Sequence, residues 1–480
     1  MHAAPRLAYA VSMAERFDLV VLGAGPAGEK GAVQAAYFGK RVAVVECASE
    51  PGGAAVHTGT LPSKTLREAA VFLSGQRARS LYGLDATRSP LDAQTSLQRL
   101  MLRKTNMAAS ESLRIRENLL RHNVSYFHGR ATVVDPRRVR IELEAEQTQD
   151  LLAEAILVAT GSVPARSQGV DFDDPRIHDS DEILSIDVLP KQLCIIGAGV
   201  IGCEYACMFA ALGAHVTLVD ARNELLPFLD SELVARLLGA MRAVGIETQL
   251  GRRFTSIARE GEQIVTQFAQ GAAVGASHLL YCAGRSGATK GLGLAALGVV
   301  IGERGHVQVD ADYRTAVPNI FAAGDVIGFP GLASSAMEQA RVAACKAFGF
   351  PYKREVSALI PLGIYTIPAL SAVGETEASC AQKGIACVVG RAHYADNARA
   401  KIIGDTTGLL KLVVSAADRK LIGVHIIGER ATELVHIGQV VIQLGGSVDT
   451  FIDMVWNYPT LSEIYKYAAY ECLAALAEAG

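Results

Sequence analysis

The order of hydrophobic and polar residues divides the chain into strand–loop–helix units. An apolar run at residues 19–22 leads into a glycine-rich turn, apolar residues then recur at helical spacing, and a second apolar run at 41–45 ends at Glu46. The same order of strand, turn, helix, strand and final acid returns between residues 193 and 220. Short apolar strands that alternate with amphipathic helices predict a parallel sheet and an α/β fold.

The pattern changes after about residue 359. Two strand-like runs, at 409–416 and 420–428, are followed by helical spacing. This tail predicts a separate α+β domain that packs a sheet and helices against a partner. A chain of 480 residues has room for about three domains, at roughly 100–200 residues for each domain.

Composition narrows the class of protein. Half of the residues are apolar, a fifth are charged and the net charge is −3, so the chain is expected to fold and has no basic surplus for nucleic acid. No apolar run reaches the roughly 18 residues of a membrane-spanning helix. The nine cysteines form no CxxC pair and lie mostly in apolar runs, which is typical of small buried residues in a reducing, cytoplasmic setting. The first residues lack the regions of a secretory signal and are expected to be a disordered extension.

Each strand–turn–helix unit contains a GxGxxG sequence. The glycines are Gly23, Gly25 and Gly28 in the first unit and Gly197, Gly199 and Gly202 in the second, where Val200 and Ile201 precede the last glycine. In such a turn the first glycine makes the bend, the second lets the backbone approach a pyrophosphate, and the third lets the helix pack on the strand. One GxGxxG is weak evidence, but two copies in complete context predict two Rossmann-like dinucleotide-binding domains.

Each unit ends in an acid that can bind a ribose. Glu46 and Asp220 follow the second strands, where a carboxylate accepts hydrogen bonds from a ribose 2′-hydroxyl. Two dinucleotides in one chain indicate FAD and a nicotinamide cofactor. Asp220 favours NAD(H), whereas Arg222 could bind the 2′-phosphate of NADP(H) as a bidentate donor. Both nucleotides are therefore expected as substrates; the alternative for Arg222 is a solvated loop charge.

Further motifs accompany these units. They are Gly52-Gly53 with Pro62-Ser63-Lys64, Gly161 in an ATGS sequence, Gly284 in an AGR sequence, and Gly324-Asp325 at the end of NIFAAGD. With these motifs the chain resembles the two-dinucleotide flavoprotein disulfide oxidoreductases, such as dihydrolipoamide dehydrogenase and glutathione reductase, from about residue 17 to 470. The resemblance implies that Lys64 and these glycines lie at the cofactors, that Asp325 binds the FAD ribityl chain, and that a helix starting near Ala333 points at the flavin.

The departures from this family concern its redox dithiol. Ala55 and Thr60 stand where members that reduce disulfides carry two cysteines, and Tyr458 replaces the C-terminal histidine, whereas Glu463 is kept. A neutral tyrosine with a pKa near ~10 is a poor proton acceptor at pH 7, so disulfide reduction is not expected. The pattern is similar to the soluble pyridine nucleotide transhydrogenases, which share the Gly-Thr-x-Pro-Ser-Lys and Asn-Tyr-Pro-Thr sequences.

The resemblance implies hydride exchange between NADPH and NAD+ through flavin N5, with ping-pong kinetics at a single site. It places Lys64 beside N5 and Glu204 next to Lys64; the alternative is an ordinary surface lysine and a helix glutamate. Thr60 either hydrogen-bonds the flavin edge or fills space, and the small Val200 either opens the nicotinamide pocket or simply packs. The catalytic candidates are Lys64, Glu204, Thr60, Tyr458 and Glu463.

Two other functions stay open. An NAD(P)H diaphorase or oxidase would pass electrons to quinones, dyes or oxygen, and a non-catalytic flavoprotein would only bind nucleotides. The charge pair of Lys64 and Glu204 argues against the second of these. Cys203 and Cys207 could be taken for metal ligands, but no histidine or cysteine lies at a zinc spacing from them, so packing is expected and no metal is predicted.

The predicted architecture is an α/β protein in which an NAD(P) domain interrupts an FAD domain. The FAD domain comprises residues 15–163 and 287–355, the NAD(P) domain comprises 164–286, and an α+β interface or dimerisation domain comprises 356–480. In the family the PTLSE segment of this last domain, residues 459–463, reaches the flavin of the other subunit. A homodimer or higher homo-oligomer is therefore implied, with no nucleic-acid or membrane partner.

Overall fold

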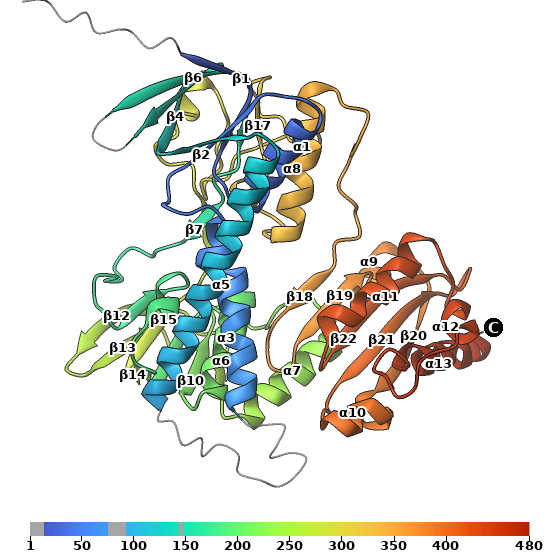
Figure 1. Cartoon of the computed structure of the whole chain (residues 1–480). Coiled ribbons are helices and arrows are strands. Elements are labelled where there is room, and N and C mark those ends of the chain that lie inside the picture. The colour runs from blue at the N-terminus through green and yellow to red at the C-terminus, as the bar shows by residue number, and fades with distance from the viewer. Residues whose placement is uncertain (1–13, 75–92, 144–146, 480) are drawn as a thin grey trace, which may run out of the picture. The chain divides into compact units, whose positions relative to one another are not determined.

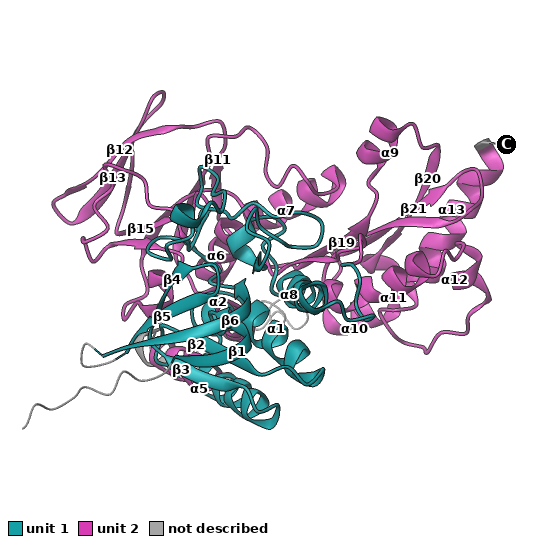
Figure 2. Ribbon diagram, turned by 90° about the horizontal axis from the view of Figure 1, so that it is seen from above, with its two compact units in different colours: residues 1–60, 108–163, 285–356 teal, residues 61–107, 164–284, 357–480 magenta. Residues whose placement is uncertain are grey.

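The computed structural model describes residues 14–74, 93–143 and 147–479, and the chain forms two compact units (Figures 1 and 2). Unit 1 comprises residues 1–60, 108–163 and 285–356, and unit 2 comprises residues 61–107, 164–284 and 357–480. The first glycine turn lies in unit 1 and the second in unit 2. The expected N-terminal extension lies outside the described residues.

A seven-stranded sheet forms the centre of unit 1. Its order is β3-β2-β1-β6-β5-β4, and β17 also pairs with β6. The strands are β1 (Glu15–Leu22), β2 (Val42–Glu46), β3 (Ser125–His128), β4 (Arg130–Asp135), β5 (Arg138–Glu142), β6 (Thr148–Val158) and β17 (Ile320–Ala322). β1 runs parallel to β2 and β6, and Leu22 lies opposite Val45 and Val158. The carboxyl ends of these three strands therefore meet just before Gly23. A short pair, β7 (Ser162–Pro164) and β16 (Arg285–Gly287), follows separately.

Helices α1 (Pro26–Tyr37) and α8 (Ala333–Phe348) pack against each other in unit 1. α1 begins with a proline, whose fixed φ suits a first helical turn. A Cβ atom on Gly31 would lie 2.5 Å from Leu157 Cδ2 and 3.2 Å from Ala340 Cβ. Glycine at this position therefore permits the close approach of α1 to β6 and α8. The short helix α2 (Gly53–His57) follows β2, and α5 (Ala93–Arg121) ends in this unit.

The first sheet of unit 2 is parallel and has the order β11-β10-β9-β15-β8. Its strands are β8 (Ile177–Asp179), β9 (Gln192–Ile196), β10 (His215–Val219), β11 (Glu247–Gln249) and β15 (His278–Tyr281). α6 (Val200–Ala211) and α7 (Ser231–Ala243) follow β9 and β10, which is the predicted βαβ order. Leu66 of α3 (Thr60–Leu73) joins the same core. A small antiparallel sheet contains β12 (Phe254–Glu260), β13 (Gln263–Phe268) and β14 (Val274–Ala276).

The second large sheet of unit 2 is antiparallel, with the order β18-β19-β22-β21-β20. Its strands are β18 (Leu362–Ile364), β19 (Leu370–Gly374), β20 (Cys387–His393), β21 (Leu409–Ser415) and β22 (Leu421–Ile427), and its helices are α9 (Glu377–Lys383), α10 (Ala398–Ile403), α11 (Ala431–Gln443), α12 (Asp449–Asp453) and α13 (Ile464–Ala479). β21 and β22 confirm the two strand-like runs predicted for this region.

Successive residues of β21 face two different cores, as the strand period of two requires. Leu410 and Leu412 pack in a core with Tyr465 of α13. Leu409 instead packs in the core that contains Leu233 of α7. The C-terminal sheet is therefore covered on one face by its own helices and on the other by a helix of the second glycine-turn domain.

Seven of the nine cysteines are buried, which confirms that most of them serve as small apolar residues. Burial raises the pKa of Cys207 and Cys282 to about 12. No group of three His, Cys, Asp or Glu side chains that could hold a metal occurs among the described residues. Within the same part of the chain, no helix combines the length and the apolar character needed to cross a membrane.

A histidine pair makes the fold sensitive to acid. His178 of β8 and His278 of β15 stack with their ring centroids 5.5 Å apart. Burial, followed by the neighbouring His178, lowers the pKa of His278 to about 4, whereas a free histidine has a pKa of about 6.5. Between these two pH values the unfolded chain binds a proton that the folded chain does not, so stability falls as the pH falls through this window.

We therefore expect the melting temperature to decrease from about pH 6.5 down to about pH 4, and to be free of this effect above pH 6.5. Replacing His278 by glutamine removes one titrating ring and should flatten the decrease. Thermal denaturation of both proteins over a pH series measures the difference. Equal slopes for the two proteins would contradict this account of the pair.

Candidate active site

The first glycine turn has no room for a side chain at Gly23 or Gly28. Gly23 has a φ of +98°, and a Cβ atom on it would lie 2.6 Å from Ala159 O. A Cβ atom on Gly28 would lie 1.8 Å from Gly23 O. Gly25 is the N-cap of α1, and no side chain caps this helix. The first N–H groups of α1 are therefore positioned for an anion, as the sequence predicts.

Glu46 fixes the end of β2 to this turn. Its carboxylate accepts hydrogen bonds from Ala24 N at 2.7 Å and from Ala48 N at 2.8 Å. Gly52 N donates to Ala24 O at 3.0 Å, and a Cβ atom on Gly53 would lie 3.0 Å from Gly25 Cα. The structure therefore brings Gly52 and Gly53 directly beside the first turn.

The residues around the first turn fit a dinucleotide. Thr160 follows β6, and a Cβ atom on Gly23 would lie 3.3 Å from Thr160 Cα. The Thr160 Oγ1 atom is buried and has no hydrogen-bond partner in the described part of the chain. Buried hydroxyl groups in proteins nearly always have a partner, and a bound group at the turn would supply one. The first N–H groups of α1, which no described side chain caps, suit a pyrophosphate, and the Glu46 carboxylate suits a ribose.

Asp325 lies on a polar chain that sequence reasoning had only partly found. Its Oδ2 atom accepts a hydrogen bond from Ser162 Oγ at 3.0 Å, and Ser162 Oγ accepts one from Arg285 Nε at 2.8 Å. Gly324 N donates to Gln339 Oε1 of α8 at 2.9 Å. Ser162 and Arg285 stand in the ATGS and AGR motifs, beside the predicted Gly161 and Gly284, but were not singled out as site residues.

α8 begins at Ala333, where the sequence predicts a helix start. Its N-cap, Leu332, offers no side-chain hydrogen bond. The positive end of the helix dipole therefore lies at Ala333 without a side-chain cap. Gly324, the residue before Asp325, approaches this helix closely, since a Cβ atom on it would lie 3.3 Å from Ala336 Cβ.

The second glycine turn repeats the geometry of the first. A Cβ atom on Gly197 would lie 2.7 Å from Cys282 O, and one on Gly202 would lie 1.8 Å from Gly197 O. Among the described residues, no atom lies within 4 Å of the Cβ position of Gly199, which leaves the backbone open to a ligand. α6 starts at Val200, and Val200 and Ile201 are partly buried against the core.

Asp220 directly follows β10, and both oxygens of its carboxylate accept hydrogen bonds. Its Oδ2 atom accepts hydrogen bonds from Ala198 N and from Arg222 Nη2, both at 2.7 Å. Its Oδ1 atom accepts from Arg222 N at 2.8 Å and Arg222 Nε at 3.0 Å. Burial raises the pKa of Asp220, but the hydrogen bonds from Arg222 and Ala198 outweigh it, so the pKa lies below its usual value. Asp220, predicted to bind a ribose hydroxyl, and Arg222, predicted to bind a 2′-phosphate, thus form one ion pair.

Lys64 and Glu204 form the predicted charge pair within unit 2. Lys64 Nζ of α3 lies 2.6 Å from Glu204 Oε2 of α6, with 25% of the lysine side chain and 5% of the glutamate side chain exposed. Tyr365, after β18, contributes twice: its backbone N donates to Glu204 Oε1 at 2.8 Å, and its ring centroid lies 4.8 Å from Lys64 Nζ. Tyr365 was missed because no sequence pattern signals a backbone N–H donor.

The two positions that the resemblance assigns to a dithiol, Ala55 and Thr60, lie on successive helices. Ala55 is in the middle of α2, and Thr60 is the first residue of α3. Between them, His57 Nε2 lies 3.0 Å from Pro51 O, and Ser112 Oγ donates to the same oxygen at 2.8 Å. His57 is thus held in a structural hydrogen-bond group.

Tyr458 and Glu463 lie in the segment before α13. The Tyr458 side chain is 72% exposed. Glu463 Oε1 accepts a hydrogen bond from Tyr467 Oη at 3.1 Å. This hydrogen bond raises the pKa of Tyr467, and it does so more than burial does. Within the described part of one chain, neither residue makes a hydrogen bond with Lys64 or Glu204.

We expect a Gly202→Ala variant to lose nicotinamide nucleotide binding and much of its stability, because its Cβ atom would overlap Gly197 O at 1.8 Å. The matched control is Gly239→Ala. Gly239 is exposed within α7, and no atom of the residues that the structure describes lies within 4 Å of its Cβ position. Alanine there should therefore add up to about 1 kcal/mol of stability. Thermal denaturation and nucleotide titration of both variants test this. A G202A protein that melts and binds like the wild type would contradict the account.

Comparison with known proteins shows the family of this chain. Residues 17–340 match the model of the pyridine nucleotide-disulphide oxidoreductase family, and residues 360–469 match the dimerisation domain of the same family. The chain belongs to this family. It is therefore an oxidoreductase, and membership implies FAD together with NAD(P)H as substrates. The dimerisation domain supports homo-oligomerisation.

The chain is also similar to curated relatives along almost its whole length. The soluble pyridine nucleotide transhydrogenase of Mycobacterium bovis is 44% identical over 458 residues, which are 95% of this chain and 97% of the relative. The soluble pyridine nucleotide transhydrogenase of Marinomonas is 38% identical over 457 residues, with 94% and 97% covered. These relatives confirm the resemblance that the Gly-Thr-x-Pro-Ser-Lys and Asn-Tyr-Pro-Thr sequences predict.

Solved structures confirm the fold class. LpdA from Mycobacterium tuberculosis is similar with a TM-score of 0.87 and 28% identity, over 95% of this chain and 99% of that chain. The copper(II) complex of the HOCl-induced flavoprotein disulfide reductase RclA from Escherichia coli has a TM-score of 0.85 and 25% identity, with 95% and 99% covered. The α/β fold with a C-terminal dimerisation domain is thus that of the flavoprotein disulfide reductases.

Proposed function

We propose that this protein exchanges hydride between NADPH and NAD+ through bound FAD, by ping-pong kinetics at a single nicotinamide site and without a redox dithiol. The observation that carries the proposal is that Ala55 in α2 and Thr60 at the start of α3 are not cysteines. By the resemblance, these are the two positions at which disulfide-reducing members of the family carry their redox cysteines. Alanine has no nucleophile, and threonine has no redox couple, so electrons have no path to a disulfide there.

The similarity to the curated transhydrogenases supports this reading. Proteins of that name match this chain at 37–44% identity and along nearly their whole length. The roles of the site residues follow by the same resemblance. Gly23, Gly25, Gly28, Glu46, Gly52, Gly53, Gly161, Gly324, Asp325 and Ala333 would hold FAD, and Gly197, Gly199, Val200, Ile201, Gly202, Asp220, Arg222 and Gly284 would hold the nicotinamide nucleotide.

The charge pair would carry the chemistry. When bound, FAD supplies a carrier that accepts a hydride from one nicotinamide and gives it to another. Lys64 would keep a fixed positive charge at the reacting edge, because Glu204 holds its ammonium group at 2.6 Å. Tyr365 would keep Glu204 from turning, since its N–H group binds the second carboxylate oxygen. A charge that is held in place before the reaction stabilises the transition state without rearrangement.

We further propose that the working form is a cytoplasmic homodimer. Large apolar side chains stand exposed in the C-terminal part of the chain: Val455 at 97%, Leu444 at 79% and Tyr458 at 72%. Exposed apolar side chains of this size would be covered by a partner subunit if they lie in one patch. Tyr458 and Glu463, which make no hydrogen bond with Lys64 or Glu204 among the described residues, would then act at the site of the partner subunit.

The test is an anaerobic assay with NADPH and thio-NAD+, in which the absorbance of reduced thio-NAD reports hydride transfer. We expect turnover at a rate at least equal to that with quinones or dyes, and parallel lines in double-reciprocal plots at several NADPH concentrations. Parallel lines are the mark of a ping-pong route, because the first product leaves before the second substrate binds.

Two results would count against the proposal. If NADPH bleaches the flavin but thio-NAD+ is not reduced, the protein is a diaphorase or oxidase, and quinones and oxygen become the acceptors to test. If the flavin is not bleached at all, the protein is a nucleotide-binding flavoprotein without this activity. Intersecting lines at normal turnover would reject only the ping-pong route at one site.

A further inference from the structure

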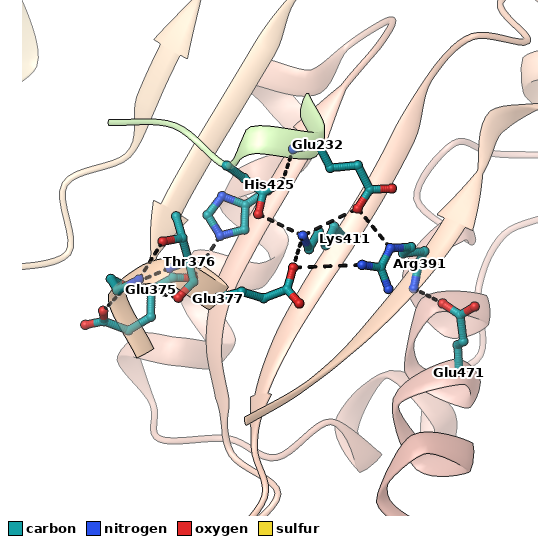
Figure 3. Close-up of polar contacts among 10 residues, drawn as sticks. Glu232, Glu375, Thr376, Glu377, Arg391, Lys411, His425 and Glu471 are labelled. Carbon is teal, nitrogen blue, oxygen red and sulfur yellow. Dashed lines mark hydrogen bonds and ion pairs between the residues drawn. The ribbon is translucent and has the colours of Figure 1, made fainter. Parts of the chain in front are cut away.

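A row of basic side chains crosses the C-terminal sheet. Arg391 of β20, Lys411 of β21 and His425 of β22 are direct cross-strand partners, and Figure 3 shows Lys411 with its charged neighbours between the sheet and the start of α7. The Lys411 side chain is only 2% exposed. An ammonium group that has lost nearly all its water must be balanced by charge inside the protein.

Carboxylates from α7 and α9 supply this balance. Lys411 Nζ lies 2.8 Å from Asp230 Oδ2 and 3.4 Å from Glu232 Oε2, and it forms a further ion pair with Glu377. Burial lowers the pKa of Lys411, but the hydrogen bonds to Asp230 and Glu377 outweigh it and hold the pKa above its ordinary value. Lys411 therefore remains charged.

Two of these carboxylates belong to the start of α7. Asp230 is the N-cap of this helix, where its side chain accepts a hydrogen bond from Glu232 N at 3.1 Å, and the side chain is 3% exposed. Glu232 Oε2 lies 2.9 Å from Arg391 Nε. The first turn of α7 is thus fixed to the C-terminal sheet by two cations, Lys411 and Arg391. Leu233 of α7 and Leu409 of β21 also belong to the same hydrophobic core.

Asp230 is also connected along the chain to Asp220, the predicted ribose-binding residue. We call the residues between them, 221–229, the ribose strap. In the middle of the strap Leu225 and Leu226 are buried. Leu226 has a φ of +45°, a conformation that a leucine keeps only where the surroundings enforce it. The strap is therefore held under constraint, and its downstream anchor is the Asp230–Lys411 pair.

We propose that Lys411 is a positioning residue for the nicotinamide nucleotide: by holding Asp230 it fixes the ribose strap, and with it the placement of Asp220 and Arg222 at the adenosine ribose. This inference rests on one part of the proposed function, namely that a nicotinamide nucleotide binds at the second glycine turn. Lys411 acts through Asp230 and the strap, so it should govern nucleotide affinity and leave the rate of hydride transfer unchanged.

The test measures NADP+ and NAD+ binding to the oxidised holoenzyme by calorimetry. We expect K411M to raise both dissociation constants about tenfold, equivalent to about 1.4 kcal/mol. The rate of flavin reduction at saturating NADPH should stay within about twofold of the wild-type rate. D230N keeps an N-cap acceptor but loses the charge, and it should also weaken binding. The double variant K411M/D230N leaves neither member of the buried pair charged. Its loss of nucleotide affinity should therefore be smaller than the product of the losses in the two single variants.

The matched control is K420M, which removes a lysine from an exposed ion pair with Asp418 on the same domain, with side chains 53% and 46% exposed; it should bind both nucleotides like the wild type. A K411M protein that melts earlier but keeps wild-type dissociation constants would overturn the proposal, because the pair would then be purely structural. If K411M does not fold, wild-type affinity in D230N overturns it equally. Binding and flavin reduction need no second nucleotide, so a failure to reduce thio-NAD+ would count against the proposed function alone.

Discussion

Replacing Lys64 by methionine is expected to slow the reduction of the bound flavin by NADPH about 100-fold, with little change in the affinity for NADPH. Methionine keeps the length of the lysine side chain and removes only the charge that Glu204 holds at 2.6 Å. Removal of one preorganised group that stabilises developing charge typically costs about 10²–10³ in rate. Stopped-flow absorbance of the flavin under anaerobic conditions measures the rate directly.

Two further variants sharpen this test. Lys383 forms an ion pair with Glu375 in which the lysine side chain is 57% exposed, so K383M removes an equal charge far along the chain from Lys64 and should reduce flavin at the wild-type rate. Glu204→Gln should give a loss in the same direction as K64M, because it frees the ammonium group from its fixed place. A K64M protein whose flavin is reduced at the wild-type rate would exclude Lys64 from the reaction.

Replacing Arg222 by alanine is expected to lower the preference for NADPH over NADH, measured as the ratio of kcat/KM values, by about 10- to 100-fold, which corresponds to loss of a hydrogen bond to a charged group. The ion pair of Arg222 with Asp220 explains how one site would accept both nucleotides. With NADPH, the guanidinium group would turn to the 2′-phosphate and offset the repulsion from Asp220. With NADH, Asp220 would accept the 2′-hydroxyl.

Steady-state kinetics with both nucleotides checks this prediction. R222A should retain or improve its use of NADH, since Asp220 loses its competing partner. Arg242, which is exposed near the end of α7, provides the control, and R242A should leave the ratio unchanged. An unchanged ratio in R222A would show that Arg222 is a solvated loop charge, which is the alternative that the sequence leaves open.

The glycine turns could be predicted from the sequence because their requirements are local. Position 28 requires glycine because a Cβ atom there would lie 1.8 Å from the backbone oxygen of Gly23, five residues earlier. Periodicity likewise indicated the strands and helices that join these turns. The roles of Lys64 and Glu204 came instead from resemblance, because 140 residues separate them and no spacing rule connects them.

Tyr365 and Lys411 could not be predicted in this way. Tyr365 binds Glu204 through its backbone N–H, a group that every residue except proline carries. Lys411 gave a weak signal, as a single charge within the apolar run LLKLVVS. Its partner Asp230 lies 181 residues away, so only the fold identifies which carboxylate compensates the buried ammonium group.

Because most of the cysteines are buried, their reaction with a thiol reagent should report unfolding of the chain. Seven thiols are buried, whereas Cys47 is exposed and Cys387 is half-buried. An alkylating reagent should therefore label at most two positions on the native protein and all nine once the chain opens. Mass spectrometry after brief labelling would then report which region opens first, because the buried thiols are spread over both units, with Cys345 in unit 1 and Cys472 in unit 2.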